Sequence, residues 1–369
     1  MQTEGSLVIL TPGFASDESD STCLPLQQSL VRVIKKQCPS LNIEILAFQY
    51  PYANRKYTIG KAIVHSFSGK NRGGLFKLLL RKRIASRLKR INAETRIIGL
   101  LSFWYGECAF VAEKFAKKHN LQHICWILGQ DARVGNKYAQ RNLLRAGQLA
   151  ALSDFIVEEF KCNYGIKPKS IIPAAIDDEE MPSSHFNKDI DILGVGSLLK
   201  LKQYDIFIRI IAEIKKRVPT INAMLIGEGN ERHHLEKLIS TLNLHGNVTL
   251  TGCLPHTEVI KHMQRSRILL HTSSYEGFGA VILEALYSGC EVISFVQPMK
   301  KEISHWQIVS SEQQMIACAL TALNKKDIHH STVPFSMQRV AAEWLKLFGI
   351  ETASVKHQSL LNLACDSIA

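Results

Sequence analysis

The sequence lacks the features that mark membrane spans, secreted disulfide frameworks and zinc sites. Its longest stretch without a charged residue, 238–257, is interrupted by glycine, proline and polar residues, so it does not predict a membrane-spanning helix. The 9 cysteines are odd in number and scattered, with no Cys-x-x-Cys pair, which argues against a disulfide framework and a zinc site. The first residues, Met-Gln-Thr-Glu, lack the basic start of a signal peptide. We therefore expect a reducing, cytoplasmic environment.

The composition is that of a globular protein with two domains. The 369 residues are 46% hydrophobic and 21% charged, which excludes disorder, collagen and coiled coil. Positive charge is concentrated in one half, because residues 1–188 carry +11 of the total net charge of +12. This half must meet an anionic partner or tolerate self-repulsion. Since no recognisable base-reading module accompanies the charge, we do not expect a nucleic-acid partner.

Strand and helix patterns alternate along the chain. The first half predicts strands at 7–10, 42–48, 96–102 and 123–128 and helices at 24–36 and 106–119. After a polar linker at 182–188, the second half predicts strands at 190–195, 222–226, 248–251, 268–272 and 292–295, with helices at 204–217, 233–242, 257–266 and 279–286. This order predicts an α/β fold of two doubly wound parallel sheets. Because ligands of such sheets bind beyond the carboxyl ends of the strands, we expect a cleft between two facing domains.

The most informative segment runs from Tyr275 to Ala285 and reads Tyr-Glu-Gly-Phe-Gly-Ala-Val-Ile-Leu-Glu-Ala. Glu276 precedes a predicted helix and Glu284 lies inside it, about 12 Å further along the axis. The two carboxylates therefore address two ends of an elongated ligand rather than one metal. The glycines between them allow close backbone approach, and the helix start attracts a phosphate. The alternative is a helix entered through a flexible loop, with both glutamates in water.

Two further loops follow predicted strands of the second half. Val195-Gly196-Ser197 leads to Lys202, which would neutralise a phosphate as a point charge at the same sheet edge, or lie solvated in a loop. Gly227-Glu228-Gly229 follows the next strand, although a lone Gly-x-Gly is weak support for a nucleotide site. Asp189-Ile190-Asp191 spells a metal-binding pattern but precedes its strand, so no metal site is expected.

Taken in order, these motifs resemble the nucleotide-sugar domain of retaining glycosyltransferases of family 4, which have the GT-B fold. The resemblance rests on Val195-Gly196, Lys202, Gly227-Glu228-Gly229, Gly252-Cys253-Leu254-Pro255 and the two glutamates with seven residues between them. It covers residues 190–348, because Phe335-Ser336 is similar to the start of that family's last helix. The first half is similar more loosely, through strand order, Gly13 and Gly129-Gln130-Asp131.

The resemblance implies a role for each matching residue. Glu284 would hold the ribose hydroxyls of a nucleotide-diphosphate sugar, Glu276 and the following amides would contact the sugar and diphosphate, and Lys202 would bind the diphosphate. Leu254 would lie against the base. The implied donor site consists of Gly13, Gly196, Ser197, Lys202, Gly229, Leu254, Glu276, Gly277, Phe278, Gly279 and Glu284, and the implied catalytic residues are Glu276, Lys202 and Asp131. The donor is a co-substrate, and neither a further cofactor nor a metal is expected.

The chain departs from the family at positions that affect activity. Ser197 replaces a frequent arginine, and Leu128 stands where the family often has an acceptor-side histidine. Asp131 would orient the acceptor hydroxyl, or act as a cap or turn residue. The resemblance implies transfer to a glycan or a lipid-linked acceptor with retention of configuration, in cell-envelope polysaccharide synthesis. The alternative is a catalytically inactive GT-B subunit that binds glycan or membrane.

Two expectations concern the domains and a basic helix. We expect an acceptor-side domain at 1–183, onto which the tail 349–369 packs, and a nucleotide-sugar domain at 184–348. Residues 73–91 predict a basic amphipathic helix with Leu80, Ile84, Leu88 and Ile91 on one face. This face would contact an anionic membrane from the inner side, or pack into the core and leave the basic face in water. The histidines are expected at the surface.

Overall fold

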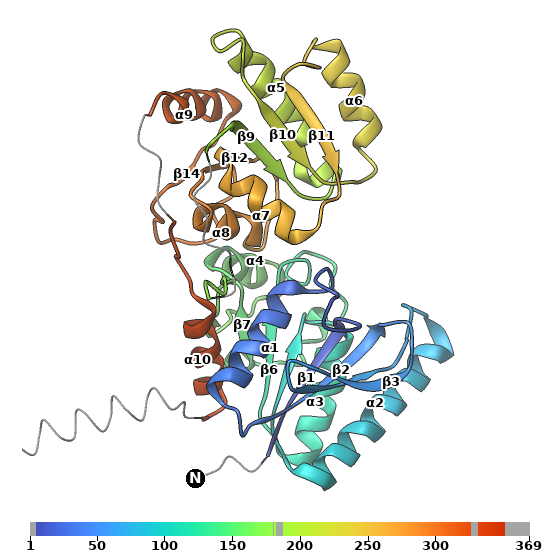
Figure 1. Cartoon of the computed structure of the whole chain (residues 1–369). Coiled ribbons are helices and arrows are strands. Elements are labelled where there is room, and N and C mark those ends of the chain that lie inside the picture. The colour runs from blue at the N-terminus through green and yellow to red at the C-terminus, as the bar shows by residue number, and fades with distance from the viewer. Residues whose placement is uncertain (1–4, 180, 182–186, 326–330, 351–369) are drawn as a thin grey trace, which may run out of the picture. The chain divides into compact units, whose positions relative to one another are not determined.

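The computed structural model describes residues 5–179, 181, 187–325 and 331–350 (Figure 1). The chain divides into two compact units. The first unit comprises residues 1–177 and 335–369, and the second comprises residues 178–334. Both are α/β units built on a largely parallel sheet, as the sequence predicts. The cleft between the domains stays a prediction, and most of the expected linker lies outside the described residues.

The first unit contains an eight-stranded sheet in the order β3-β4-β2-β1-β5-β6-β7-β8. Its strands are β1 (Ser6–Gly13), β2 (Asn42–Tyr50), β3 (Arg55–Ile59), β4 (Ala62–Ser66), β5 (Ile97–Phe103), β6 (His123–Ile127), β7 (Leu149–Ala151) and β8 (Ser170–Ile171). From β4 to β7 this is the doubly wound order 3-2-1-4-5-6, and β8 extends it by one strand. The antiparallel hairpin β3–β4 is absent from the sequence prediction, because its turn uses Gly60 and Lys61, both at positive φ, instead of an Asn-Gly pair.

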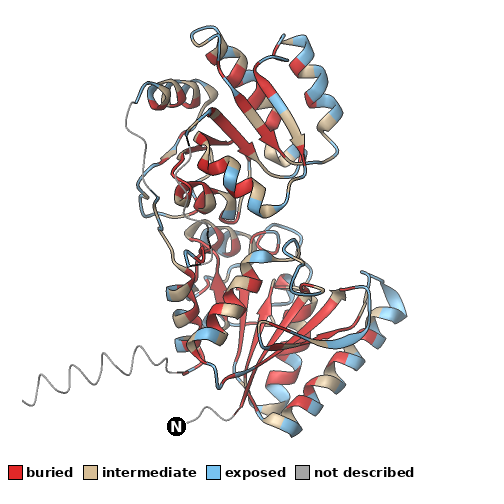
Figure 2. Cartoon of the chain, in the orientation of Figure 1, coloured by how far each residue is buried: buried red, intermediate tan, exposed pale blue. Residues whose placement is uncertain are grey.

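Helices cover the first sheet with apolar side chains. They are α1 (Pro25–Gln37), α2 (Gly74–Thr95), α3 (Glu107–His119), α4 (Asp154–Tyr164) and α10 (Met337–Leu347). The stripe of Leu80, Ile84, Leu88 and Ile91 on α2 is buried against the sheet and α3 (Figure 2). The core alternative is therefore correct for this stripe, and the prediction that it contacts a membrane is wrong.

The last helix belongs to the first unit, so the expected domain boundary near residue 348 is wrong. Trp344 of α10 is fully buried, and its ring centroid lies 5.4 Å from that of Trp126 on β6. Phe348 packs so closely on Gly99 that a Cβ there would lie 2.4 Å from its ring. The sequence analysis extended the second domain to residue 348 because Phe335-Ser336 resembles the start of the family's last helix, whereas the burial of Trp344 places α10 in the first unit. Of the tail expected to pack back, residues 351–369 lie outside the described residues.

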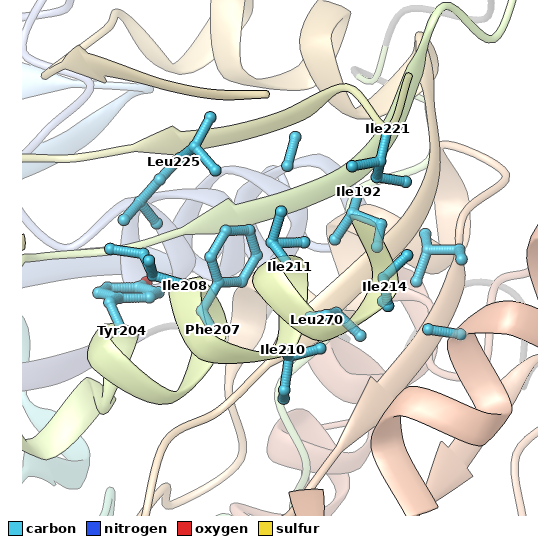
Figure 3. Packing of buried hydrophobic residues seen from close by; sticks show 14 of the residues in the cluster. Ile192, Tyr204, Phe207, Ile208, Ile210, Ile211, Ile214, Ile221, Leu225 and Leu270 are labelled. Carbon is cyan, nitrogen blue, oxygen red and sulfur yellow. The ribbon is translucent and has the colours of Figure 1, made fainter. Parts of the chain in front are cut away.

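The second unit contains a six-stranded parallel sheet in the order β11-β10-β9-β12-β13-β14, again 3-2-1-4-5-6. Its strands are β9 (Ile190–Val195), β10 (Ala223–Ile226), β11 (Val248–Gly252), β12 (Ser266–His271), β13 (Glu291–Ser294) and β14 (Trp306–Ile308). Its helices are α5 (Tyr204–Lys215), α6 (Arg232–Thr241), α7 (His256–Gln264), α8 (Ala280–Tyr287) and α9 (Glu312–Asn324). Phe207, Ile211 and Ile214 of α5 fill its core against the sheet (Figure 3). No helix in the described ranges has the length and apolarity needed to cross a bilayer.

Candidate functional site

The chain order of the second sheet reverses between β9 and β12, and Lys202 and Glu276 lie in the loops that follow these two strands. Strands β9 and β12 pair in parallel, so their carboxyl ends meet at one sheet edge. The loops that follow are joined by two hydrogen bonds, from Ser274 N to Leu201 O at 3.0 Å and from Thr272 Oγ1 to Lys202 O at 2.8 Å. Such a switch point is where doubly wound sheets bind ligands. The fold therefore brings Lys202 and Glu276 together there.

Lys202 and Glu276 form a direct ion pair. The two side chains are only 19% and 17% exposed. Ser273 Oγ donates to Glu276 Oε1 at 3.4 Å, and His271 Nε2 lies 3.5 Å from the same oxygen. Burial favours a neutral Glu276, but the neighbouring imidazole and ammonium outweigh it and hold the pKa at about 2. The carboxylate is therefore ionised throughout the physiological range, beside a cation suited to a phosphate.

Glycine residues let three loops at this edge approach each other through their backbones. Gly196 N donates to Ile226 O at 3.0 Å, and Gly227 N donates to Gly252 O at 3.0 Å. A Cβ on Gly227 would lie 1.9 Å from Gly196 O, and one on Gly229 would lie 2.3 Å from Leu198 O. No side chain fits in these positions. The Gly-x-Gly pattern thus packs the loops after β9, β10 and β11 into one surface.

The segment from Glu276 to Glu284 enters α8 as the sequence predicts. Gly279 is the residue before the helix, with a φ of +82° that disfavours other residues. Phe278 is 1% exposed and packs near Trp306, so its contribution to a ligand site is through its backbone. Glu284 lies one turn into the helix, half-buried. Its Oε1 is hydrogen-bonded to His256 Nε2 at 3.0 Å.

The His256–Glu284 pair leads to a testable pH dependence. The bond to Glu284 raises the pKa of His256, and partial burial opposes that shift. The stabilisation of the pair is therefore complete below the unfolded pKa of about 6.5 and is lost as pH rises through the folded value. We expect a coupling energy of about 0.5–1 kcal/mol at pH near 6, and less at pH near 8.5. A double-mutant cycle of His256→Gln and Glu284→Gln measures it by denaturation, and equal coupling at both pH values would contradict the assignment.

The remaining predicted donor residues are divided between the two units: Ser197 and Leu254 lie on loops of the second unit, and Gly13 ends a strand of the first. Ser197 is exposed directly after β9, and Leu254 is half-buried in the loop between β11 and α7. Gly13 is the last residue of β1 in the first unit, next to the switch point between β1 and β5. A Cβ there would touch Cys23 Sγ and Tyr50 Cβ, each at 3.4 Å. The two units are described separately, so Gly13 as a donor contact stays a prediction.

Asp131 has contacts that favour the turn alternative over a catalytic role. Its carboxylate accepts from the backbone amides of Tyr105, Leu128 and Gly129 at 2.7, 3.0 and 2.9 Å. It is 6% exposed, and burial raises its pKa to about 6 although these amides favour the charged form. Both oxygens are occupied in joining the ends of β5 and β6. Leu128 is half-buried beside it.

The Asp189 and Asp191 pattern at the start of β9 has arginine partners. Both Asp189 oxygens pair with Arg265, one of them with its Nε at 2.8 Å. Asp191 Oδ1 lies 3.8 Å from Arg267 Nη1. These carboxylates lie at the edge opposite the strand ends that carry Lys202. They serve to fix the start of the strand.

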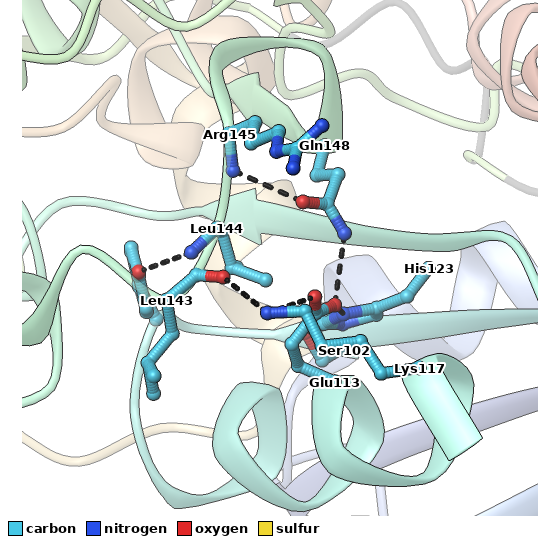
Figure 4. Close-up of polar contacts among 9 residues, drawn as sticks. Ser102, Glu113, Lys117, His123, Leu143, Leu144, Arg145 and Gln148 are labelled. Atoms are coloured by element: carbon cyan, nitrogen blue, oxygen red, sulfur yellow. Dashed lines mark hydrogen bonds and ion pairs between the residues drawn. The ribbon is translucent and has the colours of Figure 1, made fainter.

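A buried Ser–His–Glu arrangement in the first unit has the connectivity of a hydrolase triad (Figure 4). His123 bonds to Ser102 Oγ and to Glu113 Oε2, both at 2.9 Å, and Gln148 Nε2 donates to Glu113 at 2.8 Å. Ser102 is 0% exposed, so no substrate reaches it. Burial lowers the pKa of His123 despite Glu113, which keeps the imidazole neutral. The cluster fastens the loop before β7 to α3 and is structural.

Three comparisons with known proteins bear on this site. Residues 176–326 match the family model for glycosyl transferases group 1. One subunit of human phosphatidylinositol N-acetylglucosaminyltransferase is 34% identical over 127 residues, which cover 34% of this chain and 26% of that protein. The Campylobacter jejuni N-acetylgalactosamine-N,N'-diacetylbacillosaminyl-diphospho-undecaprenol 4-alpha-N-acetylgalactosaminyltransferase is 32% identical over 143 residues, 37% of this chain and 38% of that one. The chain thus spans well under half the length of these curated relatives.

Solved structures match nearly the whole chain. Anabaena Alr3699/HepE, crystallised with UDP and glucose, has a TM-score of 0.64 at 15% identity and covers 98% of this chain and 100% of its own. WaaG, a glycosyltransferase involved in lipopolysaccharide biosynthesis, has a TM-score of 0.58 at 14% identity, covering 93% and 94%. This chain has the GT-B fold. The group 1 match lies on the GT-B unit that carries Lys202, Glu276 and Glu284, and it supports the predicted family.

Sequence reasoning missed three residues that approach the predicted donor residues: His271 near Glu276, His256 at Glu284 and Tyr204 near Gly196. His271 is 3% exposed at the end of β12, and His256 contacts Glu284, whereas histidines were expected at the surface. That expectation is also wrong for His65 and His123, which are buried. A histidine directly after the apolar run Ile268–Leu270 was the available signal for His271. Tyr204 gave no signal, because its hydroxyl approaches Gly196 only once α5 is docked.

Proposed function

We propose that this protein transfers a sugar from a nucleotide-diphosphate donor to a hydroxyl of a glycan or lipid-linked acceptor. The observation that carries the proposal is the half-buried Lys202–Glu276 pair at the switch point of the second sheet, just before α8. The match to glycosyl transferases group 1 spans this segment and supports the reading. The resemblance to family 4 adds retention of the anomeric configuration to the proposal.

Donor binding follows the length of α8. The Glu284 carboxylate accepts hydrogen bonds from the ribose hydroxyls, and His256 orients this carboxylate. Lys202 and the amides of Gly277 to Gly279 receive the diphosphate, since a helix start and an ammonium both favour negative charge. Glu276 contacts the sugar. Gly196, Ser197 and Gly229 give the diphosphate room, and Leu254 lies against the base.

The chemistry exchanges one bond at the anomeric carbon for another. The bond from C1 to the diphosphate oxygen breaks, and the acceptor oxygen bonds to C1 on the same face. The acceptor proton passes to the departing diphosphate, which leaves with the electron pair of the broken bond. Lys202 and the start of α8 stabilise the charge that develops there. We propose that this positive charge makes the reaction independent of a metal, so transfer should persist in the presence of EDTA.

The acceptor side and location are proposed from the relatives' names. One relative's name specifies phosphatidylinositol and the other's specifies diphospho-undecaprenol, so both names include a lipid. A lipid-linked acceptor and a role in cell-envelope glycan synthesis on the cytoplasmic side of the membrane fit this pattern. Asp131 is not assigned to the acceptor, because three backbone amides occupy its carboxylate.

A catalytically inactive subunit is the second candidate. Leu128 and Ser197 favour it. Leu128 lacks the imidazole of the histidine that the family often has there, and Ser197 lacks the positive charge of the frequent arginine. The two functions differ in one measurement. Release of nucleotide that requires both sugar nucleotide and acceptor would exclude the inactive subunit.

Selective stabilisation by one nucleoside diphosphate tests the donor site. A thermal-shift panel of UDP, GDP, ADP and their sugars at about 100 times Kd should give about 2.7 kcal/mol for the matching base. For a chain of this size that raises Tm by roughly 5–10 °C. Glu284→Ala should abolish the shift, whereas Glu213→Ala, which removes a carboxylate from the outer face of α5, should keep it. Unchanged nucleotide affinity in Glu284→Ala would defeat the assignment.

A further inference from the structure

A buried histidine lies next to the Lys202–Glu276 ion pair. His271 ends β12 with 3% exposure, and its Nε2 lies 3.5 Å from Glu276 Oε1. This buried nitrogen has no hydrogen-bond partner within the described part of the chain. Such an atom is uncommon in a native fold, because leaving it unpaired costs free energy. The imidazole therefore keeps an unused hydrogen-bonding position beside the carboxylate.

The imidazole is neutral while the ion pair is intact. Lys202 pairs with the same carboxylate oxygen of Glu276, Oε1, that faces His271. Burial lowers the pKa of His271, Glu276 opposes this effect and Lys202 adds to it. Glu276 is ionised, because its pKa is about 2. The charges of the pair cancel, so nothing in this state favours a third charge on the ring.

The other titratable groups around His271 do not act on it. Among the described residues, the charged groups that affect its ring are Glu276 and Lys202. Burial and the charge of Glu276 raise the pKa of Tyr204 on α5, so its hydroxyl stays protonated. Carboxylates of the neighbouring elements have partners elsewhere, namely Glu284 of α8 with His256 of α7, Asp191 of β9 with Arg267, and Glu291 of β13 with His305. His271 is therefore the group whose protonation responds to a change of charge at the ion pair.

An anion bound at Lys202 makes that change. The ammonium is then shared between the phosphate oxygens and Glu276, so the cluster gains net negative charge. Negative charge nearby favours a protonated imidazole. The added proton also gives Nε2 of His271 a hydrogen that it can donate to Glu276 Oε1, which fills its unused position.

We propose that His271 takes up a proton from solvent when the donor diphosphate binds at Lys202, and so holds Glu276 in place while the lysine turns to the phosphate. The proton returns to solvent when the nucleoside diphosphate leaves. This inference rests on the proposed function, since it needs a donor at Lys202. His271 is a positioning residue in this role, because it contacts Glu276 and not the sugar nucleotide.

Donor binding should therefore depend on pH. Proton and donor favour each other's binding by the same factor, so affinity rises as pH falls. A shift of one pKa unit corresponds to a tenfold change, and we expect Kd to fall by about threefold to tenfold between pH 8 and pH 6. The probes are UDP-glucose, GDP-mannose and ADP-glucose, of which the one that raises Tm is used. Their diphosphates are esterified at both ends, so they lack the phosphate group that titrates at pH about 6.

Calorimetric titration in two buffers of different ionisation enthalpy counts the protons taken up. His271→Gln keeps a polar side chain that does not titrate, so it should lose the uptake and keep its affinity at pH 8 within about threefold of wild type. His245→Gln removes an exposed histidine of the same unit and should behave as wild type. Because His256 titrates beside Glu284, the comparison is repeated in His256→Gln, where His271→Gln should again abolish uptake. His271→Phe, which matches the ring in shape, serves if His271→Gln fails to fold.

The outcomes separate this proposal from the donor site itself. Binding of a probe to the wild type without proton uptake would overturn the proposal alone, and this result needs no variant. Equal uptake in the wild type and His271→Gln would do the same, because the proton would then go to another group. Failure of all three probes to bind would defeat the proposed donor site, and the role of His271 with it.

Discussion

Replacing Lys202 by methionine is expected to lower the rate of sugar transfer by about 10²–10³-fold and to weaken binding of the nucleoside diphosphate. Lys202 lies in the loop after β9 and forms a direct ion pair with the half-buried carboxylate of Glu276. Removing one preorganised charge from a developing anion typically costs this much. The substitution also leaves the half-buried Glu276 carboxylate without its cation, and its uncompensated negative charge repels the diphosphate. Steady-state kinetics and nucleotide titration measure the two effects.

Two further variants make the result specific. Lys200→Met removes the same charge two residues earlier, from an exposed side chain on the same short helical turn, and should leave the kinetics close to wild type. The double variant Lys202→Met/Glu276→Gln should bind UDP better than Lys202→Met alone, because the repelling carboxylate is gone. Equal losses in Lys200→Met and Lys202→Met would assign the effect to the surface potential of the protein instead of this site.

Five of the six strands of the second sheet were predictable from short, mainly apolar runs, whereas β14 (Trp306–Ile308) was not predicted, because Trp-Gln-Ile is too short to give a pattern. Ile190–Val195 coincides with β9, and Val248–Thr251 differs from β11 by one residue. A fully parallel sheet buries its strands on both faces, so they read as continuous hydrophobic segments between helical patterns. The order 3-2-1-4-5-6 then places the ends of β9 and β12 together. For this reason the meeting of Lys202 and Glu276 could be anticipated from spacing and resemblance.

Long-range packing was not available from local patterns. The stripe of α2 that includes Ile84 has the same spacing in a membrane-surface helix and in a core helix, and only the position of the sheet decides between them. Trp344 reads as one more apolar residue of the last helix until β6 supplies its contact. The turn between β3 and β4 is Gly60-Lys61, which is not one of the residue pairs usual in hairpin turns. The burial of the α2 stripe and of Trp344 depends on partners far away in the sequence, whereas the hairpin is local and lacks only a recognisable turn signal.

The site shows the same division. Lys202, Glu276 and Glu284 could be selected as candidates from the sequence, because a pattern of charged residues and glycines after a strand is local. Asp131 could not be assigned, since a carboxylate after a strand has the same sequence in a catalytic role and in a turn. Its three backbone donors come from two separate loops, at Tyr105 and at Leu128 and Gly129. Tertiary hydrogen bonding alone distinguishes the two roles.

Replacing Gly227 by alanine is expected to destabilise the second unit by about 3–5 kcal/mol, which lowers its Tm by roughly 10 °C. Gly227 has a φ of +148°, and a Cβ there would lie 1.9 Å from Gly196 O. The obstacle is backbone, so no side-chain rotation relieves it. The loops after β9 and β10 must move apart, and the hydrogen bonds donated by Gly196 N and Gly227 N are then broken. Thermal denaturation measures the loss, and UDP should no longer stabilise the variant.

The matched control is Gly246→Ala, in the loop before β11 of the same unit. A Cβ on Gly246 has no heavy atom within 4 Å, so alanine fits there and removes only the flexibility of glycine. Its Tm should stay at the wild-type value or rise slightly. If Gly227→Ala has the same Tm as Gly246→Ala and still binds UDP, the loops after β9 and β10 do not touch through their backbones. The surface on which the diphosphate is proposed to lie would then have to be formed in another way.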